Sequence, residues 1–332
     1  DPVWRLMMRF SLPAIISMTA ASSYNLVDAI FIGRLGAEAL AAMSVTFPLV
    51  LSFTAIASGT AVGVTSLIAR SMGAGDNETA DRTASISLTL CFLIGAVIAA
   101  ACLPNLDGLL RILGANEAVL PLARSYMSVI VIFYTFSGLA LVLASIIRAD
   151  GNPIFSSSIS IGSALLNIAL DPLFIFGFGA VPGMGIQGAA IATVISQTAG
   201  TAFLASHILR RKTGYNFQPG YFVPRLKIIF NIYRVGITSI VRSGAQLVVL
   251  GVINNTAASF GVVPLAIIGV LVRSGRFIQM PLLGLNQGIL PVIGYNYGAG
   301  SKNRVSEIVF KSAISGSLWS LVFWLIIMIF PD

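Results

Sequence analysis

Nine long apolar stretches constrain the fold of this chain more than any other feature of its sequence. A membrane-spanning helix needs roughly 20 predominantly apolar residues, and each stretch is long enough. They lie at about residues 8–32, 44–69, 84–104, 125–147, 154–177, 186–209, 229–258, 265–296 and 306–330. Only 10% of the residues are charged, compared with about a quarter in soluble domains. The sequence therefore predicts an all-α, polytopic membrane protein.

The basic residues between these stretches predict the orientation of the chain. With a cytoplasmic N-terminus, fourteen Lys and Arg residues fall on the inner side and three on the outer side. The inner set is Arg5, Arg9, Arg70, Arg82, Arg148, Arg210, Arg211, Lys212, Arg225, Lys227, Arg234, Lys302, Arg304 and Lys311, and the outer set is Arg34, Arg111 and Arg124. Because cytoplasmic loops carry an excess of Lys and Arg, we expect the N-terminus to be cytoplasmic.

The chain also carries an internal repeat at an offset of 225 residues. Gly36, Leu40, Ala41, Val45, Gly59, Gly63 and Ile68 match Gly261, Leu265, Ala266, Val270, Gly284, Gly288 and Ile293, and the run 73–75 (Gly-Ala-Gly) recurs at 298–300. The offset spans six predicted helices, so both copies enter the membrane in the same direction, as in parallel-repeat transporters.

This repeat predicts the domain organisation. We expect an N-terminal lobe of six helices at 1–212, a cytoplasmic linker at 213–227, and the start of a C-terminal lobe at 228–332. The second copy stops after three helices, so we expect that about three further helices complete that lobe.

Two acidic residues fall inside the apolar stretches, and the other ten fall in predicted loops or termini. Asp28 lies in the first stretch and Asp171 in the fifth, at similar depth near the outer ends. A carboxylate at membrane depth is costly and therefore marks a candidate functional site. Tyr24, Asn25 and Asn167 lie three or four residues away, which places them on the same helix faces.

We predict that Asp28 and Asp171 bind the coupling ion, supported by Tyr24, Asn25, Asn167 and Thr193. Two neighbouring buried carboxylates titrate as a unit, so they can take up H⁺. They can also bind Na⁺ at Asp28, Asp171 and Asn167; no other metal site and no cofactor is predicted. The alternative is that each aspartate only forms a hydrogen bond with a neighbouring helix.

Other residues are weaker candidates. Pro13 interrupts the first helix and is a candidate hinge, although a static kink explains it equally well. Gln246, Arg273, Asn286 and Gln287 are candidates for a substrate cavity in the second half. Ordinary bonds between helices are the alternative role of the three amides.

Several classes of function are excluded or disfavoured. The basic residues lie in loops between apolar segments, so no nucleic-acid partner is expected. The sequence contains no GxxxxGK[ST], HExxH or GxSxG motif. We therefore predict a transporter rather than an enzyme, and one that does not hydrolyse ATP.

Five segments together resemble the multidrug and toxic compound extrusion (MATE) family. They are Phe10-Ser11-Leu12-Pro13, Tyr24-Asn25-Leu26-Val27-Asp28, Arg148-Ala149-Asp150-Gly151-Asn152-Pro153, Leu166-Asn167-Ile168-Ala169-Leu170-Asp171-Pro172 and Gly294-Tyr295-Asn296-Tyr297-Gly298-Ala299-Gly300. The resemblance implies twelve helices in two lobes. It also implies that Asp28 and Asp171 form the cation site in the N-terminal lobe.

The resemblance further implies an antiporter that exports organic cations, coupled to inward flow of H⁺ or Na⁺. We expect it to be a monomer, surrounded by lipid, in the inner (plasma) membrane of a bacterium. The alternative function is a flippase for lipid-linked saccharide precursors. That cargo is anionic, and few cationic side chains lie in the second half to bind it.

Overall fold

The computed structural model describes residues 2–179, 181–210, 213–259 and 262–329. Within these ranges the side chains of residues 254, 255, 257–259, 262–274, 276, 277 and 327 are not described. In the described ranges the chain forms helices and one isolated bridge between Phe178 and Val181.

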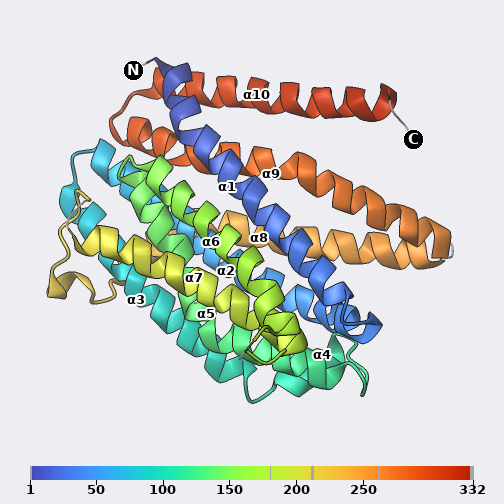
Figure 1. Cartoon of the computed structure of the whole chain (residues 1–332). Helices are drawn as coiled ribbons and strands as arrows, with labels where there is room; N and C mark the ends of the chain where they lie inside the picture. The colour runs from blue at the N-terminus through green and yellow to red at the C-terminus, as the bar shows by residue number, and fades with distance from the viewer. Residues whose placement is uncertain (1, 180, 211–212, 260–261, 330–332) are drawn as a thin grey trace.

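Each predicted apolar stretch overlaps one long helix (Figure 1). The helices are α1 (Val3–Gly33), α2 (Ala37–Gly73), α3 (Asn77–Cys102), α5 (Leu120–Ala149), α6 (Pro153–Phe176), α7 (Gly185–Leu209), α8 (Leu226–Ser259), α9 (Val262–Gly298) and α10 (Lys302–Ile329). Two short helices, α4 (Leu106–Ile112) and the 3₁₀ turn η1 (Pro219–Tyr221), were not predicted. In the described part of the chain, eight helices are long and apolar enough to span a membrane; α9 is not among these eight.

The helices extend beyond their apolar stretches, which corrects the predicted position of several acidic residues. Glu38, Glu78 and Asp107 were expected in loops, but they occupy the first turns of α2, α3 and α4. Glu307 was also assigned to a loop, although the predicted stretch begins at 306, and it lies within α10. Acidic side chains are favourable at a helix N-terminus because they complement the helix dipole, so α2 and α3 begin before their apolar segments.

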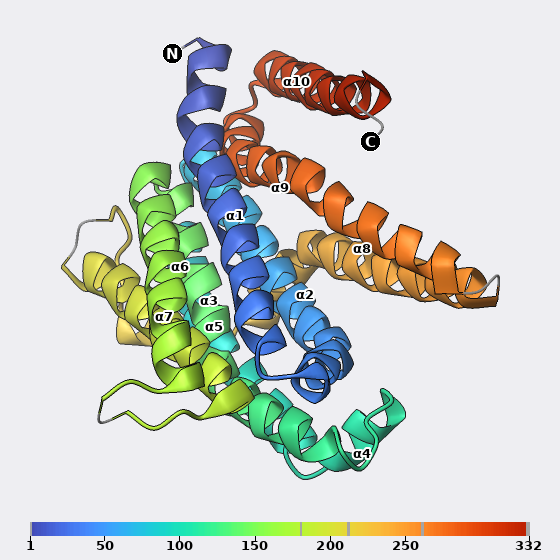
Figure 2. The same ribbon diagram turned by 45° about the vertical axis from the view of Figure 1, so that its right-hand side comes forward.

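The first seven helices form a bundle against which the later helices pack. Within the bundle, α1 packs on α6, α2 on α5, and α7 on both α5 and α6. The helix α8 then packs on α2, whereas α9 packs on both α1 and α2. Figure 2 shows the C-terminal half of α8 and the N-terminal half of α9 extending away from this bundle.

The internal repeat is visible in the backbone at the ends of α2 and α9. After α2, Gly75 has φ 75° and donates a hydrogen bond to the Met72 carbonyl at 3.1 Å. After α9, Gly300 has φ 71° and donates to the Tyr297 carbonyl at 3.1 Å. Glycine adopts this left-handed conformation without steric cost, so the matched glycines terminate both helices in the same way.

The segment between α7 and α8 is bound to the middle of α3 and to the C-terminal end of α5. The Gly214 N–H donates to Asp150 Oδ1 at 3.1 Å, and the Tyr215 hydroxyl donates to the Ile146 carbonyl at 3.2 Å. Further along, the Thr89 hydroxyl donates to the Phe222 carbonyl at 2.9 Å. Burial raises the pKa of Asp150, while the Gly214 N–H and the charge of nearby His207 oppose that rise.

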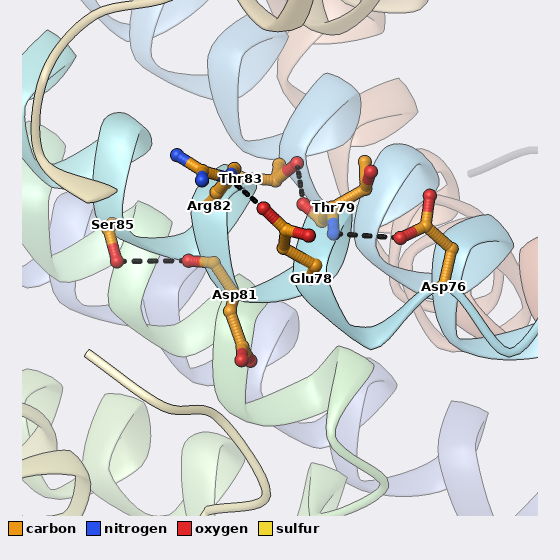
Figure 3. A network of polar contacts seen from close by, with 7 residues as sticks. All are labelled: Asp76, Glu78, Thr79, Asp81, Arg82, Thr83 and Ser85. Atoms are coloured by element: carbon orange, nitrogen blue, oxygen red, sulfur yellow. Dashed lines mark hydrogen bonds and ion pairs between the residues drawn. The ribbon is translucent and has the colours of Figure 1, made fainter. Parts of the chain in front are cut away.

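The start of α3 is held by a group of local polar contacts (Figure 3). Asp76 is the N-cap residue, and its Oδ1 accepts the Thr79 N–H at 3.0 Å. Glu78, in the first turn of α3, forms an ion pair with Arg82 one turn later, at 2.7 Å. The hydrogen bonds from the Thr79 side chain and N–H lower the pKa of Asp76. The ionised cap is therefore present at neutral pH, and its stabilising effect is lost in acid as the carboxylate is protonated.

We predict that Asp76→Ala destabilises the protein by about 0.5–2 kcal/mol at neutral pH, because the N-cap bond is lost. Thermal unfolding in detergent micelles measures the effect. Asp76→Ser is the matched control, since serine caps a helix equally well. Equal stability of the alanine and serine variants would contradict the assigned role of the cap.

Candidate functional site

Two buried aspartates from different helices approach each other within the bundle of α1, α5, α6 and α7. Asp28 of α1 is 4% exposed, and Asp171 of α6 is fully buried. The two carboxylates lie within electrostatic range of each other. In the described part of the chain, no ion pair involves either aspartate. The bundle thus holds two acidic groups, and no basic side chain among the described residues forms an ion pair with either of them.

Asn167 links Asp171 to the neighbouring helix α7. It lies one turn before Asp171 on the same face of α6 and is 3% exposed. Its Nδ2 donates to Asp171 Oδ1 at 3.2 Å and to Thr193 Oγ1 at 3.3 Å. The structure therefore brings three predicted residues together through one amide group.

Two tyrosines face the same pair of carboxylates. Tyr24, one turn before Asp28, interacts electrostatically with both aspartates and also with the Gln197 side chain of α7. Tyr126 of α5 is 7% exposed, and it interacts electrostatically with Asp28, Asp171 and Tyr24. Four helices thus contribute polar groups to one region.

Three oxygen atoms in this region are buried without a hydrogen-bond partner among the described residues. They are Asp28 Oδ1, Asn167 Oδ1 and Asp171 Oδ2. Leaving a buried polar atom unsatisfied costs about 1–3 kcal/mol, so such groups require an explanation, such as a bound ion or water. Carboxylate and amide oxygens are the ligands that hard cations prefer. The arrangement can accept a proton, a cation or water.

Sequence reasoning missed Tyr126 and Gln197. Gln197 accepts a hydrogen bond from the Ser137 hydroxyl of α5, and it also lies beside Tyr24. A polar amide within an apolar stretch is itself a signal, because it needs a partner in the membrane. Tyr126 gave no comparable signal, since a buried tyrosine is common at helix interfaces.

Two further predicted residues, Asn25 and Pro13, also lie on α1. Asn25 is exposed, and its Nδ2 donates to the Ala21 carbonyl of its own helix at 2.8 Å. Its side chain also interacts with the Tyr24 side chain, so its supporting role at the site stays a prediction. Pro13 lies inside α1 as predicted; its role as a hinge stays a prediction.

Of the four candidates for a substrate cavity, the three amides do not meet at one place. Gln246 is exposed on α8, and Gln287 contacts Met18 Sδ of α1 at 3.8 Å. Asn286 instead lines a cavity of about 630 Å³ between α9 and α10. Consecutive residues of a helix point to different faces, which separates these two amides. The Arg273 side chain lies outside the described residues.

The sequence of this chain matches the model of one protein family. The model described as MatE matches residues 13–173 and 237–332, which is most of the chain. The chain belongs to the MATE family. This membership identifies it as a multi-pass membrane transporter, in agreement with the helical fold.

Relatives of this MATE family chain are found among curated proteins and solved structures. It is 29% identical to the multidrug export protein MepA of Staphylococcus aureus (strain MSSA476) over 310 residues, which cover 93% of this chain and 68% of MepA. It is also 29% identical to the FAD transporter of Shewanella oneidensis over 321 residues, 94% of this chain and 69% of the relative.

The solved structures agree with the fold. A multidrug resistance MATE family transporter in an outward-facing conformation matches with a TM-score of 0.94 at 29% identity, covering 100% of this chain and 73% of the other. A MOP superfamily transporter from Pyrococcus furiosus matches with a TM-score of 0.93 at 30% identity, covering 99% of this chain and 72% of the other.

We predict that Asn167→Ala destabilises the protein more strongly at alkaline than at acidic pH. Without the amide, a charged Asp171 is buried unpaired, which costs about 3–5 kcal/mol, whereas a protonated one costs about 1–3 kcal/mol. Thermal unfolding across pH measures the difference. Thr193→Val, which leaves the bond to Asp171 in place, is the control. A pH-independent loss in the Asn167 variant would contradict the assigned contact.

Proposed function

We propose that this protein is a secondary active antiporter that exports organic cations and drugs in exchange for inward flow of H⁺ or Na⁺. The observation that carries the proposal is the Asp28–Asp171 pair, where one oxygen of each aspartate and one of Asn167 have no hydrogen-bond partner among the described residues. Two carboxylates in a low-dielectric region repel each other unless a proton or metal cation neutralises the site. A site of this kind takes up one cation readily and releases it when its surroundings change.

In the proposed mechanism, Asp28 and Asp171 are the coupling residues, and Tyr24, Asn167 and Thr193 position them. Tyr126 and Gln197 belong to the same site. The cation enters from the outer side, because both aspartates lie toward the ends of α1 and α6 that are expected to be outer. Binding removes the repulsion between α1 and α6, so the two helices can pack more closely while the drug is released outward.

The proposal includes the arrangement of the chain in the membrane. Residues 1–212 form one six-helix lobe, 213–227 the cytoplasmic linker, and 228–332 the beginning of a second lobe. Support comes from the shared helix ends at Gly75 and Gly300 and from the excess of basic residues on one side. The N-terminus is then cytoplasmic, in a bacterial inner membrane.

The two named relatives support different classes of substrate. MepA is named as a multidrug export protein, which supports organic drugs as cargo. The Shewanella relative is named as an FAD transporter, which makes an anionic nucleotide cofactor the second candidate cargo. The acidic pair favours the first, because a carboxylate that alternates between ionised and neutral states can be coupled to a cationic substrate.

We predict that Asp28→Asn and Asp171→Asn each reduce gradient-driven efflux of an ethidium-like dye by at least about tenfold, which corresponds to about 1.4 kcal/mol. Proteoliposomes under separate pH and Na⁺ gradients measure efflux and identify the ion. Glu117→Gln is the matched control, since it removes one carboxylate from the exposed Arg111 ion pair. Full dye efflux in either aspartate variant would refute the proposed coupling, and uptake of FAD instead of dye would reassign the cargo.

We also predict that a coupling cation stabilises the protein, because a ligand that binds only the folded state raises its stability. Adding Na⁺, or lowering the pH, should raise the thermal unfolding temperature of the natural protein. Asp28→Asn should abolish this response while Glu117→Gln retains it. An equal response in both variants would place ion binding elsewhere.

A further inference from the structure

Gln197 of α7 joins the aspartate site to two neighbouring helices. It lies four residues after Thr193, so it continues the same face of α7 by one turn. Its Oε1 accepts a hydrogen bond from the Ser137 hydroxyl of α5. Its side chain also interacts with the Tyr24 hydroxyl of α1. One amide group therefore links three helices beside the two carboxylates.

A second contact between α5 and α7 lies next to this amide. The Thr201 hydroxyl, one turn after Gln197, donates to the Phe136 carbonyl of α5 at 3.0 Å and shares its proton with the Gln197 carbonyl at 2.8 Å. Phe136 directly precedes Ser137 in the chain. Because the two helices are joined at this point, the Ser137 hydroxyl is held within reach of Gln197 Oε1.

The orientation of the amide determines what it offers to Tyr24. A glutamine side chain has one acceptor oxygen and one donor NH₂ group. The oxygen is engaged by Ser137, so the donor group is left to interact with the phenol. The Tyr24 oxygen then accepts a hydrogen bond from Gln197, and the single O–H proton of Tyr24 is directed to another acceptor.

The aspartates are the acceptors next to that proton. Tyr24 lies one turn before Asp28 on α1, and it interacts with both Asp28 and Asp171. The Asn25 amide interacts with the same phenol, so a second polar group competes for the lone pairs of the Tyr24 oxygen. Tyr24 therefore presents a hydrogen atom, and not a lone pair, to the carboxylates.

This arrangement suits a proton better than a metal cation. Hard cations are bound by several oxygen lone pairs at once. Among the described residues, the site offers three unpartnered oxygens, on Asp28, Asn167 and Asp171. The Tyr24 oxygen would be a fourth, but Gln197 engages it, and the phenol hydrogen would face the cation. A proton needs only one carboxylate oxygen.

We propose that Gln197 makes the aspartate site selective for H⁺ over Na⁺ by holding Tyr24 as a hydrogen-bond donor to the carboxylates. The inference rests on the proposed antiport and names its coupling ion. Gln197 is a positioning residue, since it acts on the ion through Tyr24. A protonated carboxyl group still accepts the phenol hydrogen, whereas Na⁺ requires the phenol to turn that hydrogen away and to release Gln197.

The first test replaces Gln197 by methionine, which has a similar length and no NH₂ group. The Tyr24 oxygen is then free to bind a cation, so Na⁺ affinity should rise by about 10–100-fold, the range over which partners of metal ligands change metal affinity. Thermal unfolding of the purified protein at alkaline pH measures this affinity, with NaCl titrated against choline chloride at constant ionic strength.

Gln187→Met is the matched control, because Gln187 is exposed on the same helix. Adding Tyr24→Phe to the Gln197→Met protein distinguishes a released ligand from a general loosening of the bundle. The gain in Na⁺ affinity should then disappear, since the phenol oxygen is absent. Unchanged Na⁺ affinity in the Gln197→Met protein would overturn the proposal, as would a gain that survives Tyr24→Phe.

Gln197→Glu tests the same residue with a side chain of nearly identical shape. Its carboxyl group keeps an acceptor for Ser137 and removes the NH₂ donor, so Na⁺ affinity should again rise. In proteoliposomes, a Na⁺ gradient should drive dye efflux several-fold faster in this variant than in the natural protein. Natural protein that is driven equally by Na⁺ and pH gradients would overturn the selectivity.

The two proposals fail in different ways. Natural protein that neither gradient drives would refute the antiport. The Na⁺ titration of the purified variants requires no transport, so it still decides whether Gln197 controls ion selectivity.

Discussion

In hydrocarbon a helix must satisfy its own backbone hydrogen bonds, and polar side chains must find partners within the protein. The side chains of this chain follow that constraint. Thr65 and Ser196 donate to carbonyls of their own helices at 2.8 and 2.7 Å, while α3 presents Phe92 and Val97 outward. The Ser157 and Thr198 hydroxyls also lack a partner among the described residues, but the unpartnered oxygens of Asp28 and Asp171 belong to carboxyl groups, which are more costly to bury. The free-energy cost of burying these carboxyl groups indicates a functional role, since apolar residues at the same positions would make the protein more stable.

The molecule uses two opposite kinds of interface. Inside the first six long helices, amide, hydroxyl and carboxylate groups of four helices meet, and their geometry depends on Asn167 holding Asp171 against Thr193. Between α2 and α9, by contrast, glycines bring bare backbones together. The first kind distinguishes one bound species from another by electrostatics. The second discriminates little, but it brings the helices close together without ordering long side chains. A transporter needs an interface of the first kind to bind its ion, and an interface of the second kind allows two helices to pack closely.

Much of the fold and of the candidate site could be predicted from the sequence, because the bilayer restricts which structures can span it. Apolar length predicted every long helix, and the cost of a charge at membrane depth singled out Asp28 and Asp171. Spacing by four residues placed Asn167 beside Asp171. The parts that failed depend on tertiary contact. Tyr126 reaches the site from a helix whose sequence gives no polar signal, and Asn286 and Gln287 part to different faces of α9. The seven residues of α4 are too few for a periodic pattern to identify.

The segment that joins α7 to α8 affects how strong the contact between the two halves must be. Gly214, Tyr215 and Phe222 are bound to α3 and α5, so only a few residues before Leu226 act as a free tether. A short tether keeps its two ends at an effective concentration in the millimolar range. At that concentration even a contact of low intrinsic affinity re-forms after each separation. The apolar contacts between the halves, such as those of Met7 and Phe10 of α1 with Ile289 and Val292 of α9, therefore need not hold the halves together unaided.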